Sequence, residues 1–426
     1  MNTSELQQAL QAGRLDEALT RVYGQAQLQA QRDRFVKAVQ RFDELFGQRD
    51  EVRLFTVAGR SEISGNHTDH NHGRVLAASI DLDIIAVAAK TTENTVEIQS
   101  EGFDKDVVCL SKLEVDPARF YHSDALIAGV CRGMQDRGFA VGGYVAYTTS
   151  NVLKGSGLSS SAAFEDMVGN IMNHLYNEGR IDNAEIAKIS QYAENVYFGK
   201  PCGLMDQVAC AMGGFVSIDF ADPKQPVIVP LAFDLTGAGY SLCIVNTGGN
   251  HADLNEDYAS VPLEMKQVAA HFGKEVLRDV TLEQIISDIP ALRKECGDRA
   301  ILRAIHYENE NERVDRQAHA LQAGDLDAFF RGVKQSGLSS FCYLQNVYTV
   351  KNVQEQGLSL ALALAENYLA NRGGAWRVHG GGFAGTIQAF VKTQDVPGYR
   401  KLMDAVFGAG ACIELHVRAV GAGYIW

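Results

Sequence analysis

The sequence predicts a mixed α/β (α+β) fold of two domains, and three observations support this prediction. Its 426 residues, of which 46% are hydrophobic, exceed the usual size of one domain and can bury a large core. Apolar, β-branched runs that are typical of strands alternate with segments of helical periodicity. Residues 142–175 read as strand, glycine-serine turn and helix, an arrangement in which the start of the helix can bind an anion.

In the first part of the chain, a long helical segment precedes two strands. Helical periodicity covers residues 4–46 and stops at Gly47, a residue type that commonly ends helices. The apolar runs at 52–58 and 75–89 are rich in β-branched residues and predict strands. Between these runs lies the polar stretch 59–73, GRSEISGNHTDHNHG.

The next hundred residues predict three helices and two strands. The first helix covers 123–137, and the apolar run 142–149 is a buried strand. After the glycine-serine turn, apolar residues recur at helical spacing at Phe164, Met167, Val168, Ile171, Met172 and Leu175. A helix at 183–198, a glycine turn and a strand at 215–220 follow.

The last part of the chain predicts strands around a long helical region. Residues 241–247 are a strand, and residues 258–336 are mainly helical and charged. A glycine cluster separates two short strands within 376–391. Since no linker-like segment is present, we place the boundary by the change in pattern near residue 220, which gives domains 1–219 and 220–426.

Composition and charge exclude several classes of protein. Asp and Glu number 52 against 39 for Lys and Arg, so the formal net charge is −13 and a nucleic acid is an unfavourable partner. The eight cysteines are scattered with no C-x-x-C pair, which predicts free thiols in a reducing compartment. The start of the chain does not resemble a signal sequence, and no run of about eighteen apolar residues occurs. We expect a cytoplasmic protein without membrane partners, either a monomer or a weak dimer.

A glycine and serine loop, GSGLSSSAA at residues 155–163, is the first candidate site. Gly155 and Gly157 let a ligand approach the backbone closely, and the helix that follows offers free N–H groups and the positive end of its dipole to an anion. These properties suit the phosphates of a nucleotide. A serine-rich helix cap is the alternative, and no G-K-[ST] follows that would make this a Walker A loop.

Two carboxylates are the second candidate. Asp206 lies in GKPCGLMDQ, residues 199–207, among small and apolar neighbours. A partly desolvated carboxylate in such a place can accept a proton or bind a metal. Glu194 falls near the end of the predicted helix at 183–198, where a solvated position on the helix surface is the simpler interpretation.

The polar stretch 59–73 is the third candidate, because Arg60, His67, Asp69 and His70 lie close together in it. A transition-metal site is one interpretation, but the stretch lacks a histidine pair at helical i, i+4 spacing and a cysteine partner. A dense set of hydrogen-bond donors and acceptors suits a polyol better, since sugars are recognised through many directed hydrogen bonds. The stretch is therefore predicted to bind a sugar.

Together these segments resemble the GHMP kinases of sugars and metabolites, and among them the galactokinase family. Galactokinases carry G-R-x-N-x-I-G-E-H-x-D-Y-N, and residues 59–71 read GRSEISGNHTDHN. The family loop G-x-G-L-S-S-S-A matches residues 155–162 letter for letter, and C-G-[IL]-M-D-Q matches 202–207. The run at 306–329 and the glycine cluster after Arg377 complete the family order over nearly the whole chain.

The resemblance implies the two-domain GHMP kinase fold, with an N-terminal ribosomal-protein-S5-like domain, a C-terminal ferredoxin-like domain and the active site between them. It also implies a sugar 1-kinase that uses ATP and Mg²⁺ to phosphorylate galactose. Asp206 would accept the proton of the anomeric hydroxyl or orient it, and Arg60 would lower the pKa of that hydroxyl and stabilise charge in the transition state. Ser161 and Glu194 would hold Mg²⁺ between the β- and γ-phosphates.

The same resemblance implies the residues that bind the two substrates. ATP would be bound by the loop residues Gly155, Ser156, Gly157, Leu158, Ser159, Ser160 and Ser161. The sugar would be bound by Asn66, His67, Asp69, Gly203 and Tyr258.

The sugar-binding stretch also departs from the family motif. Asn66 stands where galactokinases have a glutamate that resembles an acceptor for the C6 hydroxyl of the sugar, and Glu62 replaces the family asparagine. Loss of a negative charge at position 66 would tolerate a C6 carboxylate, so a kinase for a C6-modified galactose such as galacturonate is one alternative. A non-catalytic sensor of sugar and ATP is another, although Arg60, Asp206 and Glu194 are all intact.

Overall fold

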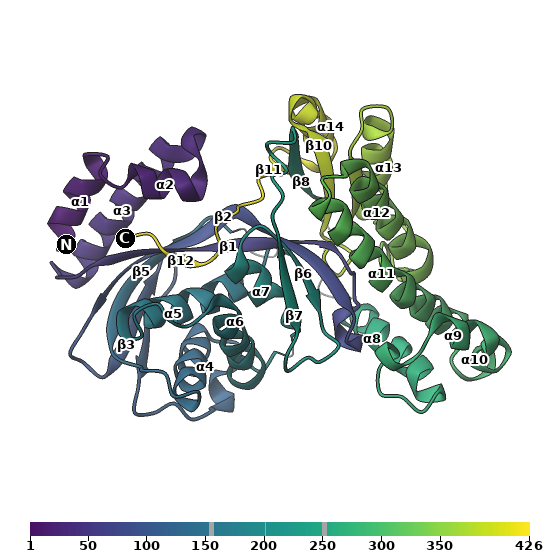
Figure 1. Ribbon diagram of the computed structural model, residues 1–426, viewed down its shortest axis with the longest axis horizontal. Coiled ribbons are helices and arrows are strands. Elements are labelled where there is room, and N and C mark those ends of the chain that lie inside the picture. The colour runs from purple at the N-terminus through teal and green to yellow at the C-terminus, as the bar shows by residue number, and fades with distance from the viewer. Residues whose placement is uncertain (153–156, 201, 249–253) are drawn as a thin grey trace.

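The computed structural model describes residues 1–152, 157–200, 202–248 and 254–426, and Figure 1 shows two sheets with helices packed on them. In the described part of the chain, the larger sheet has eight strands in the order β12-β1-β2-β5-β3-β4, with β6 and then β7 attached to β2. Its strands are β1 Arg53–Ser64, β2 Arg74–Lys90, β3 Thr95–Ser100, β4 Asp106–Cys109, β5 Tyr144–Ser150, β6 Phe215–Asp219, β7 Val227–Leu231 and β12 Gly423–Tyr424.

Strand β2 organises the larger sheet because its two halves have different neighbours. It pairs with β1 along its length, while its first half, Arg74–Ala78, also pairs with β6, and its second half, Ile84–Lys90, pairs with β5. Alternate residues of β2 belong to separate cores: Ala86 packs with one, and Ile85 with the other. A sheet covered on both faces explains why β2 reads as a continuous apolar run.

Helices cover both faces of this sheet (Figure 1). One face carries α4 to α7, and the other carries α1 to α3. The bounds are α1 Thr3–Gln11, α2 Asp16–Tyr23, α3 Leu28–Phe46, α4 Ser123–Asp136, α5 Ser160–Tyr176, α6 Asn183–Tyr192 and α7 Met205–Met212. Helix α3 ends at Gly47, whose φ of 71° is readily adopted by glycine, so the predicted helix end is confirmed.

The smaller sheet has the strand order β11-β8-β10-β9. Its strands are β8 Tyr240–Asn246, β9 Ala375–His379, β10 Thr386–Lys392 and β11 Cys412–Leu415. The helices of this half are α8 Asn255–His271, α9 Leu282–Ser287, α10 Ile289–Glu295, α11 Asp298–Gln322, α12 Leu326–Ser339, α13 Gly357–Leu369 and α14 Val396–Phe407. Helices α13 and α14 pack on one face, and α11 and α12 fill the space toward β2.

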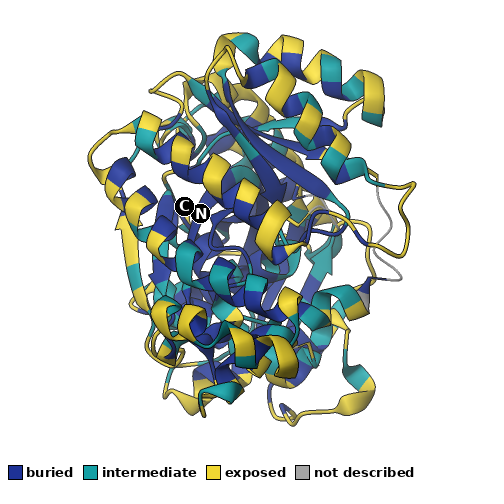
Figure 2. Cartoon of the chain, turned by 90° about the vertical axis from the view of Figure 1, so that its right-hand side faces the viewer, coloured by how far each residue is buried: buried dark blue, intermediate teal, exposed yellow. Residues whose placement is uncertain are grey.

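Short 3₁₀ and π turns complete the described elements. The 3₁₀ turns are Gln25–Gln27, Asp69–Asn71, Pro117–Arg119, Leu277–Asp279 and Thr393–Asp395, and the π turns are Ala193–Phe198 and Ser340–Leu344. Figure 2 shows a group of dark blue, buried strands and helices whose bands alternate between buried and exposed residues, whereas strand β7 is mostly exposed. None of the helices in the described ranges is long and apolar enough to cross a membrane.

The two sheets meet at the end of β1, and here the structure corrects one expectation. The polar stretch 59–73 was predicted to lie between strands, yet β1 continues to Ser64. Its backbone stays in a strand because the smaller sheet satisfies it: Gln388 Nε2 donates to Glu62 O at 2.8 Å, and Arg377 Nη1 donates to Ile63 O at 3.0 Å.

Two other predictions concern the cysteines and the domain boundary. All eight cysteines are free, as predicted, although only Cys131, Cys210, Cys243 and Cys412 are buried. The domain boundary at 219/220 stays a prediction, and we note that β7 and β12 both pair within the larger sheet.

Candidate active site

The centre of the site is an ion pair between Arg60 of β1 and Asp206 in the first turn of α7. Arg60 Nε donates to Asp206 Oδ1 at 2.8 Å. The other carboxylate oxygen, Oδ2, accepts a hydrogen bond of 2.5 Å from Ser159 Oγ, just before α5. Three segments far apart in the sequence therefore converge on one carboxylate, of which about a third, 34%, is exposed.

The electrostatics of this pair keep Asp206 ionised. Burial by itself would raise the pKa of Asp206, but the charge of Arg60 and the hydrogen bonds from Ser159 and Arg60 outweigh it, so the pKa lies below its usual value. Arg60 is buried, and its guanidinium also donates to the carbonyl of Gly157 in the serine loop. The arginine thus joins the carboxylate to the loop.

The described part of the serine loop has the backbone of an anion site. Gly157 has a φ of 73° and Ser159 a φ of 60°, and the Leu158 carbonyl accepts from the Arg60 backbone N–H at 3.2 Å. Helix α5 starts at Ser160 with no side-chain cap, so N–H groups of its first turn, which includes Ser161, are left for a ligand.

Two of the predicted loop residues, Gly155 and Ser156, lie outside the described residues.

Glu194 lies behind Asp206, and its surroundings overturn the simpler interpretation of a solvated helix residue. It is buried in the π turn after α6. Lys200 Nζ donates to its Oε1 at 2.8 Å, and Gln207 Nε2 donates to its Oε2 at 2.8 Å. The same amide reaches Glu165 Oε2 at 3.2 Å, while Glu165 Oε1 is buried without a hydrogen-bond partner among the described residues. Burial, and then the charge of Glu194, hold the pKa of Glu165 well above its usual value.

This group of carboxylates fits a divalent cation. Glu165 and Glu194 share the amide of Gln207, Lys200 pairs with Glu194 alone, and one buried oxygen of Glu165 has no partner in the described structure. Hard cations such as Mg²⁺ prefer carboxylate oxygens. No group of three or more His, Cys, Asp or Glu side chains that could hold a metal is present among the described residues. The two glutamates would therefore need a further kind of ligand, and the transition-metal interpretation of stretch 59–73 gains no support.

A cavity of about 210 Å³ opens in front of Asp206. Its lining consists of Asp69, His70, Cys202, Gly203, Met205 and Asp206. Glycine at position 203 leaves room for Asp69, because a Cβ here would stand 2.4 Å from Asp69 Oδ2 and would displace that carboxylate. The close approach of Gly203 to Asp69 brings the C-G-L-M-D-Q segment against the predicted sugar-binding stretch.

The remaining predicted sugar residues meet at the glycine cluster 380–382 instead. His67 Nε2 donates to Gly381 O at 2.9 Å, Tyr258 Oη donates to Gly382 O at 2.6 Å, and Asn66 Nδ2 donates to Gly380 O at 2.8 Å. Burial lowers the pKa of His67 to about 4, so its ring is neutral at neutral pH. The structure thus gathers the sugar residues into two neighbouring groups, one at the cavity and one at the glycine cluster.

Helix α11 fixes the backbone of stretch 64–74 through side chains on one face. His306 Nε2 donates to Asn66 O at 3.0 Å, and Tyr307 Oη donates to Asn71 O at 2.7 Å. Glu310 Oε1 accepts from Gly65 N at 3.0 Å, and Asn311 Oδ1 accepts from Arg74 N at 2.7 Å. These contacts give a physical reason for the family-specific run at 306–329.

Sequence reasoning missed Glu165 and His379. Glu165 follows Ser161 by four residues, and a charged residue inside an apolar helix was the available signal. His379 stands between Arg377 and the glycine cluster, and its ring lies 3.6 Å from where a Cβ on Gly157 would be. Burial and the charges of Arg60 and Arg377 hold the pKa of His379 well below its usual value, so a neutral ring packs against the serine loop.

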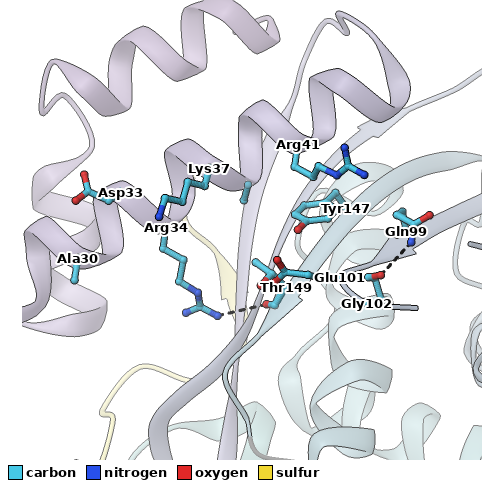
Figure 3. Close-up of a pocket in the computed structure, with 12 residues that line it drawn as sticks. Ala30, Asp33, Arg34, Lys37, Arg41, Gln99, Glu101, Gly102, Tyr147 and Thr149 are labelled. Carbon is cyan, nitrogen blue, oxygen red and sulfur yellow. Dashed lines mark hydrogen bonds between the residues drawn. The ribbon is translucent and has the colours of Figure 1, made fainter. Parts of the chain in front are cut away.

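A second cavity, of about 700 Å³, lies between α3 and the strands β3 and β5 (Figure 3). Lys37 and Arg41 line it from α3, Tyr147 lines it from β5, and Glu101 lines it from the turn after β3. Since α3 covers the face of the sheet opposite to α5 and α7, this cavity is separate from the candidate active site.

Comparison with known proteins first defines the class. Residues 125–214 match the family of GHMP kinases N terminal domain, and residues 40–90 match the galactokinase galactose-binding signature. A solved Methanococcus jannaschii mevalonate kinase has the same fold at 12% identity, with a TM-score of 0.60 and 87% of this chain and 99% of that chain covered. The chain has the mixed helix and strand fold of the GHMP kinases, which confirms the predicted fold class.

Closer relatives narrow the class. The galactokinase of Streptomyces coelicolor is 31% identical over 375 residues, which are 87% of this chain and 92% of the relative. The galactokinase of Actinobacillus pleuropneumoniae serotype 3 is 31% identical over 372 residues, 86% of this chain and 92% of the relative. The crystal structure of Lactococcus lactis galactokinase complexed with galactose aligns with a TM-score of 0.74 at 24% identity, covering 90% of this chain and 97% of that chain. The chain belongs to the galactokinase family, as its motifs predict.

Proposed function

We propose that the protein is an ATP-dependent sugar 1-kinase that transfers the γ-phosphate of ATP to the anomeric hydroxyl of galactose. The observation that carries this proposal is the convergence of Arg60, Asp206 and Ser159 beside the serine loop, with Asp206 opening onto a cavity. Membership of the galactokinase family supports galactose as the substrate. Galactose 1-phosphate would be the product.

The electrostatics of Asp206 favour a particular role in this reaction. Because its pKa lies below the usual value, the Asp206 carboxylate is a weak base. It would not take the proton from the sugar hydroxyl before phosphoryl transfer begins. It would instead accept a hydrogen bond from the hydroxyl, orient it toward the γ-phosphate, and receive the proton late, as phosphoryl transfer proceeds through a loose transition state. Arg60 would stabilise the negative charge that develops on the transferred group.

The serine loop and the carboxylates behind it suit the nucleotide. The N–H groups at the start of α5 would bind phosphate oxygens, joined by the loop residues before it. Ser161 and Glu194 would hold Mg²⁺, with Glu165 close by. The ion would neutralise charge on the β- and γ-phosphates. Lys200 now pairs with Glu194 and would be free to turn toward the phosphates when the ion is bound.

The cavity in front of Asp206 suits the sugar. Asp69 would accept hydrogen bonds from sugar hydroxyls, and Gly203 keeps the space beside it open. His67 and Tyr258 hold the glycine cluster that borders the site. The neutral state of His67 leaves the site without an added positive charge, which agrees with a neutral sugar.

The Asp206→Asn change tests the proposal. Turnover of galactose should fall by about 10²- to 10⁴-fold, while nucleotide binding, measured by calorimetry, should stay within about twofold of the wild type, since the loop is unaltered. Asp104→Asn is the matched control, because it removes an exposed carboxylate about a hundred residues away in the sequence. It should leave both turnover and nucleotide binding unchanged. Retained turnover in the Asp206 variant would show that another group performs its role.

The two alternatives are less favoured. A sensor without catalysis would need no ion pair aimed at a cavity, yet Arg60 and Asp206 form one. A preference for galacturonate was inferred from the loss of a charge at Asn66, but a carboxylate, Glu62, lies within hydrogen-bond distance of that amide. Parallel assays of ADP release with galactose and galacturonate separate all three possibilities, since a sensor turns over neither.

A further inference from the structure

Glu62 and Asn66 exchange the residue types of the family motif. Galactokinases have asparagine at the first of these positions and glutamate at the second, and this chain has them the other way round. In the structure the two side chains are direct partners, because Asn66 Nδ2 donates to Glu62 Oε1 at 2.8 Å. Both lie inside the segment that matches the galactose-binding signature. Two substitutions that look independent in the sequence are therefore one contact.

The amide of Asn66 has no capacity left for a ligand. Its Nδ2 donates both to Glu62 and to Gly380 O at 2.8 Å, and its Oδ1 accepts from Asn346 Nδ2 at 2.6 Å and from Ser340 Oγ at 3.4 Å. An amide offers two donor hydrogens and two acceptor sites, so all four are used. Asn66 is also buried, with 1% of its surface exposed. A sugar hydroxyl could bond to it only by displacing one of these partners.

Glu62 has the capacity that Asn66 lacks. Its Oε1 accepts from Asn66 and lies 3.4 Å from Arg377 Nη2, whereas its Oε2 makes no hydrogen bond with the described residues and is not fully enclosed. Glu62 follows Arg60 by two positions in a regular part of β1, where Arg60 pairs with Ser79 and Glu62 with Ala77. Side chains two apart on a strand leave the same face, so Glu62 points to the side of the sheet from which Arg60 reaches Asp206.

We propose that Glu62, and not Asn66, is the member of this exchanged pair that contacts the sugar, and that Asn66 is the positioning residue that orients it. The proposal rests on the proposed function as a sugar kinase and adds a specificity determinant to it. Its consequence is that the sugar site keeps its negative charge at a new position. An uncharged hydroxyl can donate to Glu62 Oε2, whereas the carboxylate of a uronate meets a like charge.

A double exchange tests whether the two positions form one pair. Asn66→Glu places two carboxylates together and Glu62→Asn leaves two amides, so each single change should lower kcat/KM for galactose by about tenfold or more through KM for the sugar. The double variant Glu62→Asn/Asn66→Glu restores one carboxylate and one amide, and should recover to within about threefold of the wild type. A double variant whose loss equals the product of the two single losses would overturn the proposal.

The isosteric change Glu62→Gln tests the charge itself and keeps the question decidable if Asn66→Glu does not fold. It should raise the ratio of galacturonate to galactose turnover by about tenfold or more, since like charges a few ångströms apart in a partly buried site repel strongly. The control Glu114→Gln removes an exposed carboxylate and should leave the ratio unchanged. An unaltered ratio in Glu62→Gln would mean that the charge of this residue does not determine which sugar is phosphorylated.

A readout without sugar separates this proposal from the proposed function. The midpoints of thermal unfolding of the wild type, the two single variants and the double variant measure the coupling between positions 62 and 66 directly. A wild type that does not phosphorylate galactose would refute the proposed substrate, while strong coupling would still support the exchanged pair. Additive midpoints would refute the pair whatever the sugar assays show.

Discussion

Protonation of His306 is expected to loosen the sugar-binding stretch and destabilise the fold. The imidazole is buried between the end of α12 and the turn that follows β1: Nε2 donates to Asn66 O at 3.0 Å, and Nδ1 accepts from Ser339 Oγ at 2.8 Å. Burial, followed by the charges of Arg313 and Arg377, lowers the pKa of His306 to about 3. A second proton would sit on Nδ1, so the Ser339 hydroxyl would have to turn from donor to acceptor, and the new charge would be buried beside Arg313 and Arg377.

The magnitude follows from linkage. In the unfolded chain a histidine has a pKa near 6.5, so the unfolded state binds the proton first. The contribution of His306 to the free energy of unfolding is therefore present above about pH 6.5 and is lost as the pH falls from there toward about 3. At pH 5 the difference amounts to about 1.5 pH units, or about 2 kcal/mol.

Urea unfolding at pH 7 and at pH 5 measures this effect. The wild type should lose about 2 kcal/mol more between these conditions than His306→Gln, whose amide does not titrate. The comparison is needed because His67, with a pKa of about 4, adds a similar loss to both proteins. His319→Gln, a change at an exposed residue of the same helix, should follow the wild type. Equal losses in the wild type and His306→Gln would refute the reasoning.

Three further predictions concern the active site. Gly203→Ala puts a Cβ 2.4 Å from Asp69 Oδ2, so KM for galactose should rise about tenfold or more with ATP binding unchanged. An unaltered KM in sugar titrations would show that Asp69 does not bind the sugar. Ser159→Ala deletes a 2.5 Å donor to Asp206, and kcat should fall by about ten- to a hundredfold, because hydrogen bonds to charged groups contribute about 1.5–3 kcal/mol; a kcat within twofold of the wild type would speak against this role. Glu194→Gln removes one of the two carboxylates that share Gln207 and should raise the Mg²⁺ concentration for half-maximal activity by about tenfold, so an unchanged magnesium titration would contradict the assignment.

Local pattern was enough to predict most of the elements. Apolar residues at the spacing of a strand or a helix predict β2 and α5, and Gly47 predicts the end of α3. The resemblance predicts that Arg60 and Asp206 act on the same sugar hydroxyl, and their direct pairing is a finding of the structure, because nothing in either local segment shows that residues 146 positions apart will meet. Family motifs supplied the long-range information that periodicity lacks.

What the sequence could not supply is the partner of each polar side chain. Asn66 was predicted to contact the sugar from its place in a motif, yet its amide bonds to residues 62, 340, 346 and 380. The local sequence around Glu194 by itself favours a solvated helix residue, although the family resemblance implies a Mg²⁺ ligand, and the structure buries this side chain against Gln207. In both cases the deciding contacts come from other elements, so the local sequence carries no signal of them.

The position of the sugar-binding stretch between the two sheets explains why its contacts matter for stability as well as for binding. Residues 64–74 leave β1 as an irregular turn, whose backbone groups need partners once buried. His306, Tyr307, Glu310 and Asn311 of α11 supply them, and their spacing places all four on one face of that helix. The stretch can therefore reach its final conformation only when α11 is packed against β2. Loss of any of these four side chains is expected to lower sugar affinity and unfolding free energy together, whereas Gly203→Ala should affect sugar binding and Ser159→Ala catalysis, each with little change in the free energy of unfolding.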